Sequence, residues 1–200
     1  MAKGPAYNVP YRRRREGKTN YKLRKRLISS GLPRIVTRKT NRHIIVQLVE
    51  PAPKGDKVIA SAHSSELRKK YGYLGSLSNL PSAYLSGLLC GYRTAAKGIK
   101  KAVFDVGLHS PSRGAHVFAT LKGFLDAGIE VAHDKEILPD ENRISGQHIS
   151  SYAKDLSSDP DTYSRRFSEY LSRGLAPEKI SEHFHLVKER ITSDFKEGNS

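Results

Sequence analysis

The sequence of 200 residues contains a single cysteine, Cys90, and no tryptophan. One cysteine cannot form an intramolecular disulfide, and no other cysteine or histidine lies near it at zinc-ligand spacing, which excludes disulfide scaffolds and zinc ribbons. No apolar run approaches the roughly 18 residues that span a bilayer. The arginines near the N-terminus precede no apolar stretch of the signal-peptide kind. We therefore expect a soluble, intracellular protein with no membrane partner.

Acidic side chains are almost absent from the first fifth of the chain. Residues 1–42 hold 14 Lys and Arg and one acid, Glu16, whereas residues 43–200 hold 21 basic and 19 acidic side chains. A basic arm on a nearly neutral body is typical of proteins that neutralise phosphates. An arm that lies on a membrane needs a second, apolar face. Residues 1–22 contain no leucine, isoleucine or phenylalanine.

The arm, residues 1–32, combines arginine with tyrosine. Repulsion within the run of four arginines predicts that residues 1–20 are disordered until an anion is present, and Tyr21–Ser30 are predicted to form a short helix that ends at Gly31. Arginine donates forked hydrogen bonds to phosphate, and tyrosine stacks on unpaired bases, which favours folded RNA. A solubilising or nuclear-localisation-like tail is the alternative. The candidate RNA-binding residues are Tyr11, Arg12, Arg13, Arg14, Arg15, Lys18, Tyr21, Lys22, Arg24, Lys25 and Arg26, continued by Arg34, Arg38, Lys39, Arg42 and His43.

The body, residues 33–133, is predicted to be an α/β domain with a mixed five-stranded sheet. Three short strands joined by tight turns indicate an antiparallel meander over residues 34–62. Helices at 81–99 and 117–125 alternate with apolar strands at 102–106 and 129–132, which favours parallel pairing through right-handed crossovers. We expect Gly87, Cys90 and Gly91 to let the first helix lie close on the sheet.

Residues 134–200 are predicted to form a helical C-terminal extension. Its helices are expected at 144–156, 160–171 and 178–195, with Asp159 as an N-cap and Gly174 as a stop. Residues 106–200 hold 12 basic and 15 acidic side chains, so this half is less suited to phosphate contact than the first. A protein-binding adaptor that uses this extension is one alternative function.

A mixed sheet of this kind also raises the alternative of a metal-dependent, ribonuclease-H-like nuclease. Two-metal chemistry needs several converging carboxylates, and the first strand offers none. We expect Asp105 and Asp126 to be caps or ion-pair partners. His183 and His185 lie two apart on a predicted helix and face different sides, so they cannot share a metal. No enzymatic activity, metal or cofactor is predicted.

Several segments, in order, resemble one known family. They are RRRREGKTNYKLRKRL at 12–27, TNRH at 40–43, LSNLPSAYLSGLL at 77–89 and AVFDVGLHSPSRGAHVFATLKGFLDAGI at 102–129. Together they are similar to the universal 5S-rRNA-binding family of large-subunit ribosomal proteins. The segment RISGQHISSYAKDL at 143–156 resembles the archaeal and eukaryotic branch, and the compact 63–77 loop favours an archaeal source.

The resemblance implies a ribonuclease-H-like fold without catalytic carboxylates. It implies a structural constituent of the large subunit, in the cytoplasmic ribosome, that binds 5S rRNA and helps attach it to the large-subunit rRNA in the central protuberance. The implied partners include neighbouring 5S-binding and central-protuberance ribosomal proteins. The family's RNA contacts map onto Arg12, Arg13, Arg14, Arg15, Lys18, Tyr21, Arg24, Lys25, Arg26, Asn41, Arg42 and His43, with His109, Arg113 and His116 as a secondary set.

Overall fold

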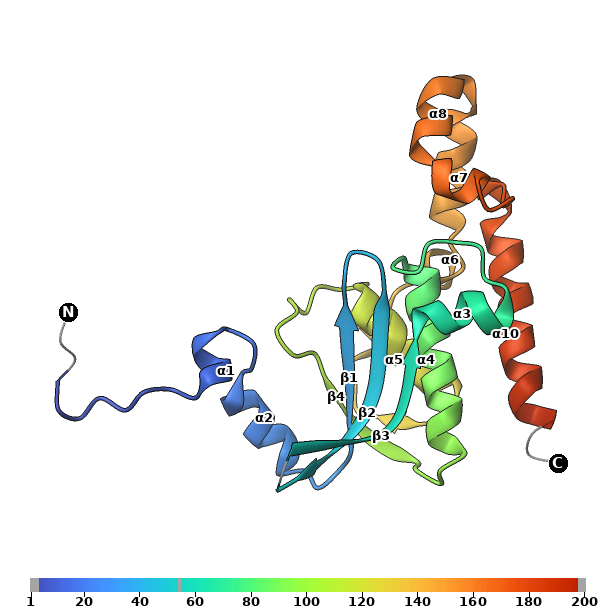
Figure 1. The fold of residues 1–200 in the computed structure, drawn as a ribbon. Helices are drawn as coiled ribbons and strands as arrows, with labels where there is room; N and C mark the ends of the chain where they lie inside the picture. Colours follow the sequence, from blue (N-terminus) through green and yellow to red (C-terminus); the bar gives the residue numbers. More distant parts are fainter. Residues whose placement is uncertain (1–3, 54, 198–200) are drawn as a thin grey trace.

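The computed structural model describes residues 4–53 and 55–197; residues 1–3, 54 and 198–200, among them the first residues of the predicted arm and the last of the predicted tail, lie outside these ranges. A five-stranded sheet with the order β3-β2-β1-β4-β5 forms the centre (Figure 1). Its strands are β1 (Arg34–Lys39), β2 (Ile44–Ala52), β3 (Gly55–His63), β4 (Lys101–Asp105) and β5 (Glu130–Val131). The pairs β1–β2 and β2–β3 are antiparallel, whereas β1–β4 and β4–β5 are parallel. The predicted mixed sheet is confirmed; the ribonuclease-H-like label stays a prediction.

The two faces of the sheet differ, and β1 shows how. Ile35 and Thr37 are buried, and Thr37 Oγ1 lies 2.9 Å from Thr120 Oγ1 in helix α5 (His116–Asp126). Because successive strand residues point to opposite faces, Arg34, Val36 and Arg38 face away from α5. The helices therefore cover one face, and the other is left for the arm.

Helix α4 (Leu80–Ala95) packs against α5 at very short range. A Cβ atom on Gly87 would lie 2.2 Å from the Thr120 carbonyl oxygen, and one on Gly123 would lie 2.4 Å from the Tyr84 carbonyl oxygen. Only glycine permits this approach. The prediction that Gly87 lets α4 lie on the sheet is therefore wrong, because this glycine faces α5.

The other two small residues of α4, Cys90 and Gly91, face different neighbours: Cys90 faces the sheet, and Gly91 faces the end of α5. Cys90 does lie against the sheet, with Sγ 3.7 Å from the carbonyl oxygen of Val46 in β2. A Cβ atom on Gly91 would lie 2.6 Å from Cβ of Ala127, just after α5. Only the cysteine therefore behaves as the sequence analysis expected.

The segment 63–77 is not a simple loop, because Ser64–Tyr71 form helix α3. His63 caps this helix: its Nδ1 accepts from Ser65 N at 3.1 Å, while Glu66 Oε1 accepts from His63 N at 2.9 Å. Histidine is not among the usual N-cap residues. Sequence patterns that search for Ser, Thr, Asp or Asn miss this start.

The tail, defined as residues 134–197, is helical, as predicted. Its elements are η1 (Lys135–Ile137), α6 (Glu141–Ile144), α7 (Gln147–Asp155), η2 (Leu156–Ser158), α8 (Pro160–Arg166), α9 (Ser168–Leu171), η3 (Pro177–Lys179) and α10 (Ile180–Glu197). Two predicted helices are each divided, one at Gly146, where φ is 85°, and one at Phe167. Asp159 is confirmed as an N-cap, since its Oδ1 accepts from Thr162 N at 3.3 Å. None of the described helices is long and apolar enough to cross a membrane.

Helix α10 shares the core of the body. Phe184, Val187 and Ile191 belong to the same buried cluster as the sheet and α4. Polar contacts add to this docking: Tyr71 OH donates to Asp194 Oδ2 at 2.8 Å, and Leu74 N donates to His183 Nε2 at 2.9 Å. The tail is thus a structural part of the body rather than a loose appendage.

The arm, residues 4–32 of the described chain, contains α1 (Arg12–Arg15) and α2 (Tyr21–Ile28), and it projects from the body at a different place from the tail (Figure 1). Helix α2 confirms the predicted helix after Tyr21. The single turn α1 was not expected from four adjacent arginines. Disorder of residues 1–20 in the absence of RNA stays a prediction.

Candidate nucleic-acid interface

Helix α2 has one basic face and one apolar face. Asn20 Oδ1 caps it by accepting from Leu23 N at 3.1 Å. Positions three and four apart share a helix face, so Lys22, Lys25 and Arg26 form one exposed surface, whereas Leu23 and Leu27 on the other side are half-buried. The sequence thereby fixes which side of α2 is available to a partner.

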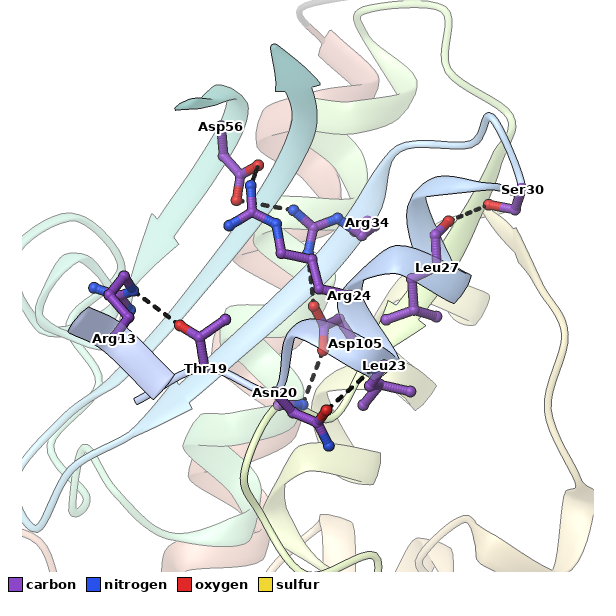
Figure 2. A network of polar contacts seen from close by, with 11 residues as sticks. Arg13, Thr19, Asn20, Leu23, Arg24, Leu27, Ser30, Arg34, Asp56 and Asp105 are labelled. Atoms are coloured by element: carbon purple, nitrogen blue, oxygen red, sulfur yellow. Dashed lines mark hydrogen bonds and ion pairs between the residues drawn. The ribbon is translucent and has the colours of Figure 1, made fainter. Parts of the chain in front are cut away.

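Arg24 of α2 and Arg34 of β1 share one carboxylate, that of Asp56, which attaches α2 to the sheet (Figure 2). Arg24 Nη2 lies 2.8 Å from Asp56 Oδ1, and Arg34 Nη2 lies 2.8 Å from Asp56 Oδ2. The other terminal nitrogen of Arg34, Nη1, lies 2.8 Å from Asp105 Oδ2, and Asp105 Oδ1 accepts from Gly107 N at 2.9 Å. Asp56 therefore bridges the arm and β1.

Arg34 is 2% exposed, so it differs from the other predicted RNA-binding residues. Both terminal nitrogens are held by carboxylates, and its Nε is buried without a hydrogen-bond partner in the described structure. An RNA phosphate cannot reach this guanidinium without breaking an internal ion pair. We therefore leave Arg34 out of the interface: it joins β1 to Asp56 and Asp105, and Asp56 in turn holds Arg24 of the arm.

A cavity of about 570 Å³ lies between the arm, β1 and the loop that follows β4. This volume is within the range of about 300–1,000 Å³ that is usual for ligand sites. The arm contributes Arg13, Lys18 and Arg24, the sheet contributes Arg34 and Arg38, and the loop contributes His109. The structure thus brings together predicted residues from three segments.

Eleven of the seventeen residues that line the cavity were not predicted as site residues. Thr19, Asn20 and Gly107 also line the cavity. Thr19 Oγ1 accepts from Arg13 Nε at 2.8 Å, which ties α1 to the segment that leads into α2 (Figure 2). Of Thr19, Asn20 and Gly107, only Asn20 could have been identified from the sequence, because asparagine before a predicted helix is a usual N-cap.

The only acid of the arm, Glu16, serves two cations. Its carboxylate lies 2.9 Å from Lys18 Nζ and 3.9 Å from Arg12 Nε. All three side chains are solvent-exposed, and such pairs contribute about 0–1 kcal/mol each. Arg12 and Lys18 therefore stay available for stronger, phosphate-type partners.

Tyr11 and Tyr21 form a ring pair, with centroids 5.1 Å apart and planes inclined by 46°. Tyr11 is 73% exposed, whereas Tyr21 is half-buried. An exposed tyrosine face beside arginines is the arrangement on which an unpaired base stacks. Of the two rings, Tyr11 offers the more open face.

The hairpin turn between β1 and β2 presents Arg38, Lys39, Asn41 and Arg42 to solvent. His43 differs from them. Its ring centroid lies 4.9 Å from that of His63, and burial lowers the pKa of His43, with further lowering by His63, Arg68 and Arg42. We expect His43 to be neutral at pH 7, so it offers hydrogen bonds rather than charge.

The loop 106–116 does not place its three predicted residues together. His109 lines the cavity, whereas Arg113 Nη2 lies 3.0 Å from Glu136 Oε2 on the surface. His116 opens α5, on the covered side of the sheet. Of these three predicted residues, only His109 lines the cavity.

Most of the predicted cations are exposed and unneutralised. Within the described ranges, no acidic side chain pairs with Arg14, Arg15, Lys22, Lys25, Arg26, Arg38, Lys39 or Arg42. Adjacent like charges repel, and a polyanion that replaces their small counterions relieves this repulsion. The arm and the hairpin turn thus offer a surface suited to a phosphate backbone.

Comparison with known proteins decides the family. The model of a family described as "Ribosomal large subunit proteins 60S L5, and 50S L18" matches residues 5–100 and 94–134. The large ribosomal subunit protein uL18 of Staphylothermus marinus is 53% identical over 198 residues, which cover 98% of each chain. The chain belongs to this family. Large ribosomal subunit protein uL18 of Caldivirga maquilingensis is 52% identical over 196 residues, 98% of this chain and 95% of the relative.

Membership of the uL18 family, in its archaeal type, makes this chain a structural, non-enzymatic component of the large ribosomal subunit, and so of the cytoplasmic ribosome. Ribosomal RNA and ribosomal proteins are its surroundings. The two carboxylates considered for a nuclease are ion-pair partners, as expected: Asp105 pairs with Arg34, and Asp126 Oδ1 lies 2.9 Å from Lys122 Nζ.

Proposed function

We propose that the protein binds 5S rRNA through its arm and the hairpin turn, and that it helps to attach 5S rRNA to the large-subunit rRNA in the central protuberance. Neighbouring 5S-binding ribosomal proteins are the protein partners in this proposal. The observation that carries it is the exposed face of α2, where Lys22, Lys25 and Arg26 lie together with no acidic partner in the described structure.

The attachment of α2 explains why this face points outward. The ion pair of Arg24 with Asp56, and the half-buried Leu23 and Leu27, hold the opposite side of the helix against the body. The three cations are thereby presented at a fixed position rather than on a loose chain. A fixed position reduces the entropy that the arm loses when it meets RNA.

The cavity beside α2 adds a place where one nucleotide of a loop or bulge fits. Arg13 and Arg38 supply cations there, while Asn20 and His109 supply hydrogen-bonding groups. Sequence-specific recognition of RNA relies on bases that leave the helical stack. In the proposal, the basic face contacts backbone phosphates and the cavity receives such a nucleotide.

A salt titration of binding to a 5S rRNA transcript tests the proposal. In one variant Arg14, Arg15, Lys22, Lys25 and Arg26 become Gln; in the matched control Lys69, Lys70, Lys154, Arg165 and Arg166, exposed cations on α3 and the tail, become Gln. Each lost phosphate contact reduces the slope of log K against log salt by about 0.7 to 0.9. The arm variant is therefore expected to lose about 3.5 to 4.5 units of slope, and the control less than one.

Two results would contradict the proposal. Equal slopes for the arm variant and the control would mean that the arm makes no phosphate contacts. Equal affinity for 5S rRNA and an unrelated transcript of the same length, measured with competitor tRNA, would mean that the arm binds RNA without selecting this one.

A further inference from the structure

A single ion pair provides the polar contact between α2 and the body. Arg24 Nη2 lies 2.8 Å from Asp56 Oδ1 (Figure 2). All other hydrogen bonds and ion pairs that residues 11–32 form with described residues stay within the arm. The docking of α2 on the sheet therefore depends, for its polar contacts, on one carboxylate.

Apolar packing adds little to this docking. Helix α2 contains no buried residue, and its two inward-facing leucines, Leu23 and Leu27, are only half-buried. The helix has eight residues, and isolated helices shorter than about 12–15 residues are marginal in water. When α2 leaves the sheet, it therefore also unfolds.

The linker between α2 and β1 is held by local contacts only. Ser30 Oγ donates to the Leu27 carbonyl oxygen at 2.6 Å and accepts from Leu32 N at 3.3 Å. Gly31 has a φ of 68°, and a Cβ atom there would meet no atom within 4 Å. The sheet begins at Pro33, whose carbonyl oxygen accepts from Val103 N at 2.9 Å. Residues 29–32 therefore let α2 leave the sheet without disturbing β1.

The two halves of the ion pair differ in how firmly they are held. Asp56 Oδ2 also accepts from Arg34 Nη2 at 2.8 Å, and Arg34 is 2% exposed, so the carboxylate stays fixed to the body. The side chains of Arg24 and Asp56 are 29% and 30% exposed. Water and salt can reach this pair, and pairs of this kind are weakened by screening. The contact is therefore of a strength that can open and close.

We propose that the Arg24–Asp56 ion pair is a latch. In the free protein, α2 exchanges between a docked helical state and an undocked unfolded state, and the latch sets the ratio of the two. Leu23 and Arg24 line the cavity beside β1, so the cavity is complete only while α2 is docked. Asp56 is thus a positioning residue for the arm, although it lies in β3.

The latch is a property of the free protein, but its consequence for RNA rests on the proposed function. Only the docked state presents Lys22, Lys25 and Arg26 at a fixed position. The apparent affinity of a ligand falls in proportion to the fraction of protein in the binding-competent state. A weaker latch therefore lowers RNA affinity without removing any cation that contacts RNA.

Amide hydrogen exchange of α2 in the full-length protein, without RNA, tests the latch. Arg24→Gln removes it and leaves the ion pairs of Arg34 with Asp56 and Asp105 in place. Lys22→Gln is the matched control, because Lys22 is an exposed cation of the same helix without an acidic partner in the described structure. We expect the hydrogen-bonded amides of α2 to exchange about three- to tenfold faster in Arg24→Gln, and at the original rate in Lys22→Gln.

Salt provides a second readout that separates the latch from a general loss of helix stability. Higher salt screens the ion pair, so it should speed the exchange of α2 amides in the Lys22→Gln control. In Arg24→Gln there is no pair to screen, and the same increase in salt should have little effect. Glutamine, lysine and arginine have similar helix propensities, so propensity does not produce this difference.

A double-mutant cycle shows whether Arg24 acts through Asp56. Asp56→Ala removes the shared carboxylate and is also expected to speed the exchange of α2 amides. Because it takes a partner from Arg34 as well, the combination is more informative than the single change. If the two residues act as one latch, Arg24→Gln should have no further effect in the Asp56→Ala background.

Two results would overturn the latch. One is equal exchange of α2 amides in Arg24→Gln and Lys22→Gln; the other is an effect of Arg24→Gln that is as large with Asp56→Ala as without it. Failure of the proposed function looks different, because it shows only in the salt titration with RNA. A latch that behaves as expected, beside an arm variant that loses no salt slope, would leave the latch standing and the RNA proposal wrong.

Discussion

The arm and the tail are both additions to the body, but their apolar and charged residues have different partners. Helices α1 and α2 of the arm contain no buried residue, whereas α10 of the tail buries Ile180, Phe184, Val187 and Ile191 to between 0 and 2% exposure. The apolar residues of α10 pack against the body, whereas most arm cations are exposed and form no ion pair with an acidic side chain of the described residues. Burial therefore stabilises the tail, and the arm depends on an external polyanion.

The largest expected effect comes from removing a buried tail side chain. Phe184→Ala should reduce the free energy of unfolding by about 3–5 kcal/mol, because it leaves a cavity between α10 and α4. Leu186→Ala on the same helix is the control: Leu186 is 44% exposed, and surface changes stay within about 0.5 kcal/mol. Guanidinium unfolding measures both. A loss below about 1 kcal/mol for Phe184→Ala would show that the tail is not part of the common core.

A smaller loss is expected where the arm meets the sheet. Arg34→Leu leaves Asp105 and Asp56 without their buried partner. Removing one member of a buried pair costs about 3–5 kcal/mol, and we expect about 2–3 here because Asp56 is partly exposed. Arg38→Leu, four residues further along the same face of β1 and exposed, should change stability by less than about 0.5 kcal/mol. Equal effects of the two changes would mean that the Arg34 ion pairs contribute nothing.

The same ion pair separates this account from the nuclease alternative. A ribonuclease-H-like nuclease would use Asp105 as a metal ligand, so its activity would disappear in Asp105→Asn. We expect no magnesium-dependent cleavage of labelled RNA by either the original protein or this variant. Turnover that Asp105→Asn abolishes would restore the nuclease hypothesis.

The exposed ring of Tyr11 is expected to affect binding but not stability. If a base stacks on it, Tyr11→Ala should weaken 5S rRNA binding by about 1–3 kcal/mol while the salt slope stays the same, because no charge is lost. Tyr152→Ala in the tail, a ring that is 47% exposed, is the control. Equal affinities of the two variants would show that Tyr11 packs only on Tyr21.

The smallest expected effect is a pH dependence at the contact between α10 and the loop after α3. His183 Nε2 accepts from Leu74 N, and burial and then Arg190 lower the pKa of His183. Protonation breaks this bond, so its stabilisation is complete above the unfolded pKa of about 6.5 and is lost as pH falls toward the lower folded value. His183→Gln should reduce the rise in stability between about pH 5 and 7. Identical pH profiles would contradict this role.

Local patterns predicted the sheet and the main helices well. Alternation over residues 34–62 indicated the meander, and apolar periodicity indicated α4 and α5. These patterns did not predict which segments, distant in the sequence, contact one another. The face of α4 that carries Gly87 meets α5 rather than the sheet, because Thr120 approaches from another helix.

In the candidate site, too, the features that depend on local spacing could be predicted from the sequence, whereas those that depend on distant residues could not. The exposed cations of α2 follow from helical spacing alone, because Lys22, Lys25 and Arg26 share one face. The burial of Arg34 does not follow from spacing, since its partners lie 22 and 71 residues away in the sequence.

Amide hydrogen exchange, with and without a 5S rRNA transcript, tests the difference between arm and tail most directly. The account predicts that amides of residues 4–20, including α1, exchange rapidly in the free protein and slowly in the complex, while amides at Phe184, Val187 and Ile191 are protected in both. Amides of residues 4–20 that are already protected in the free protein, and that RNA leaves unchanged, would contradict it.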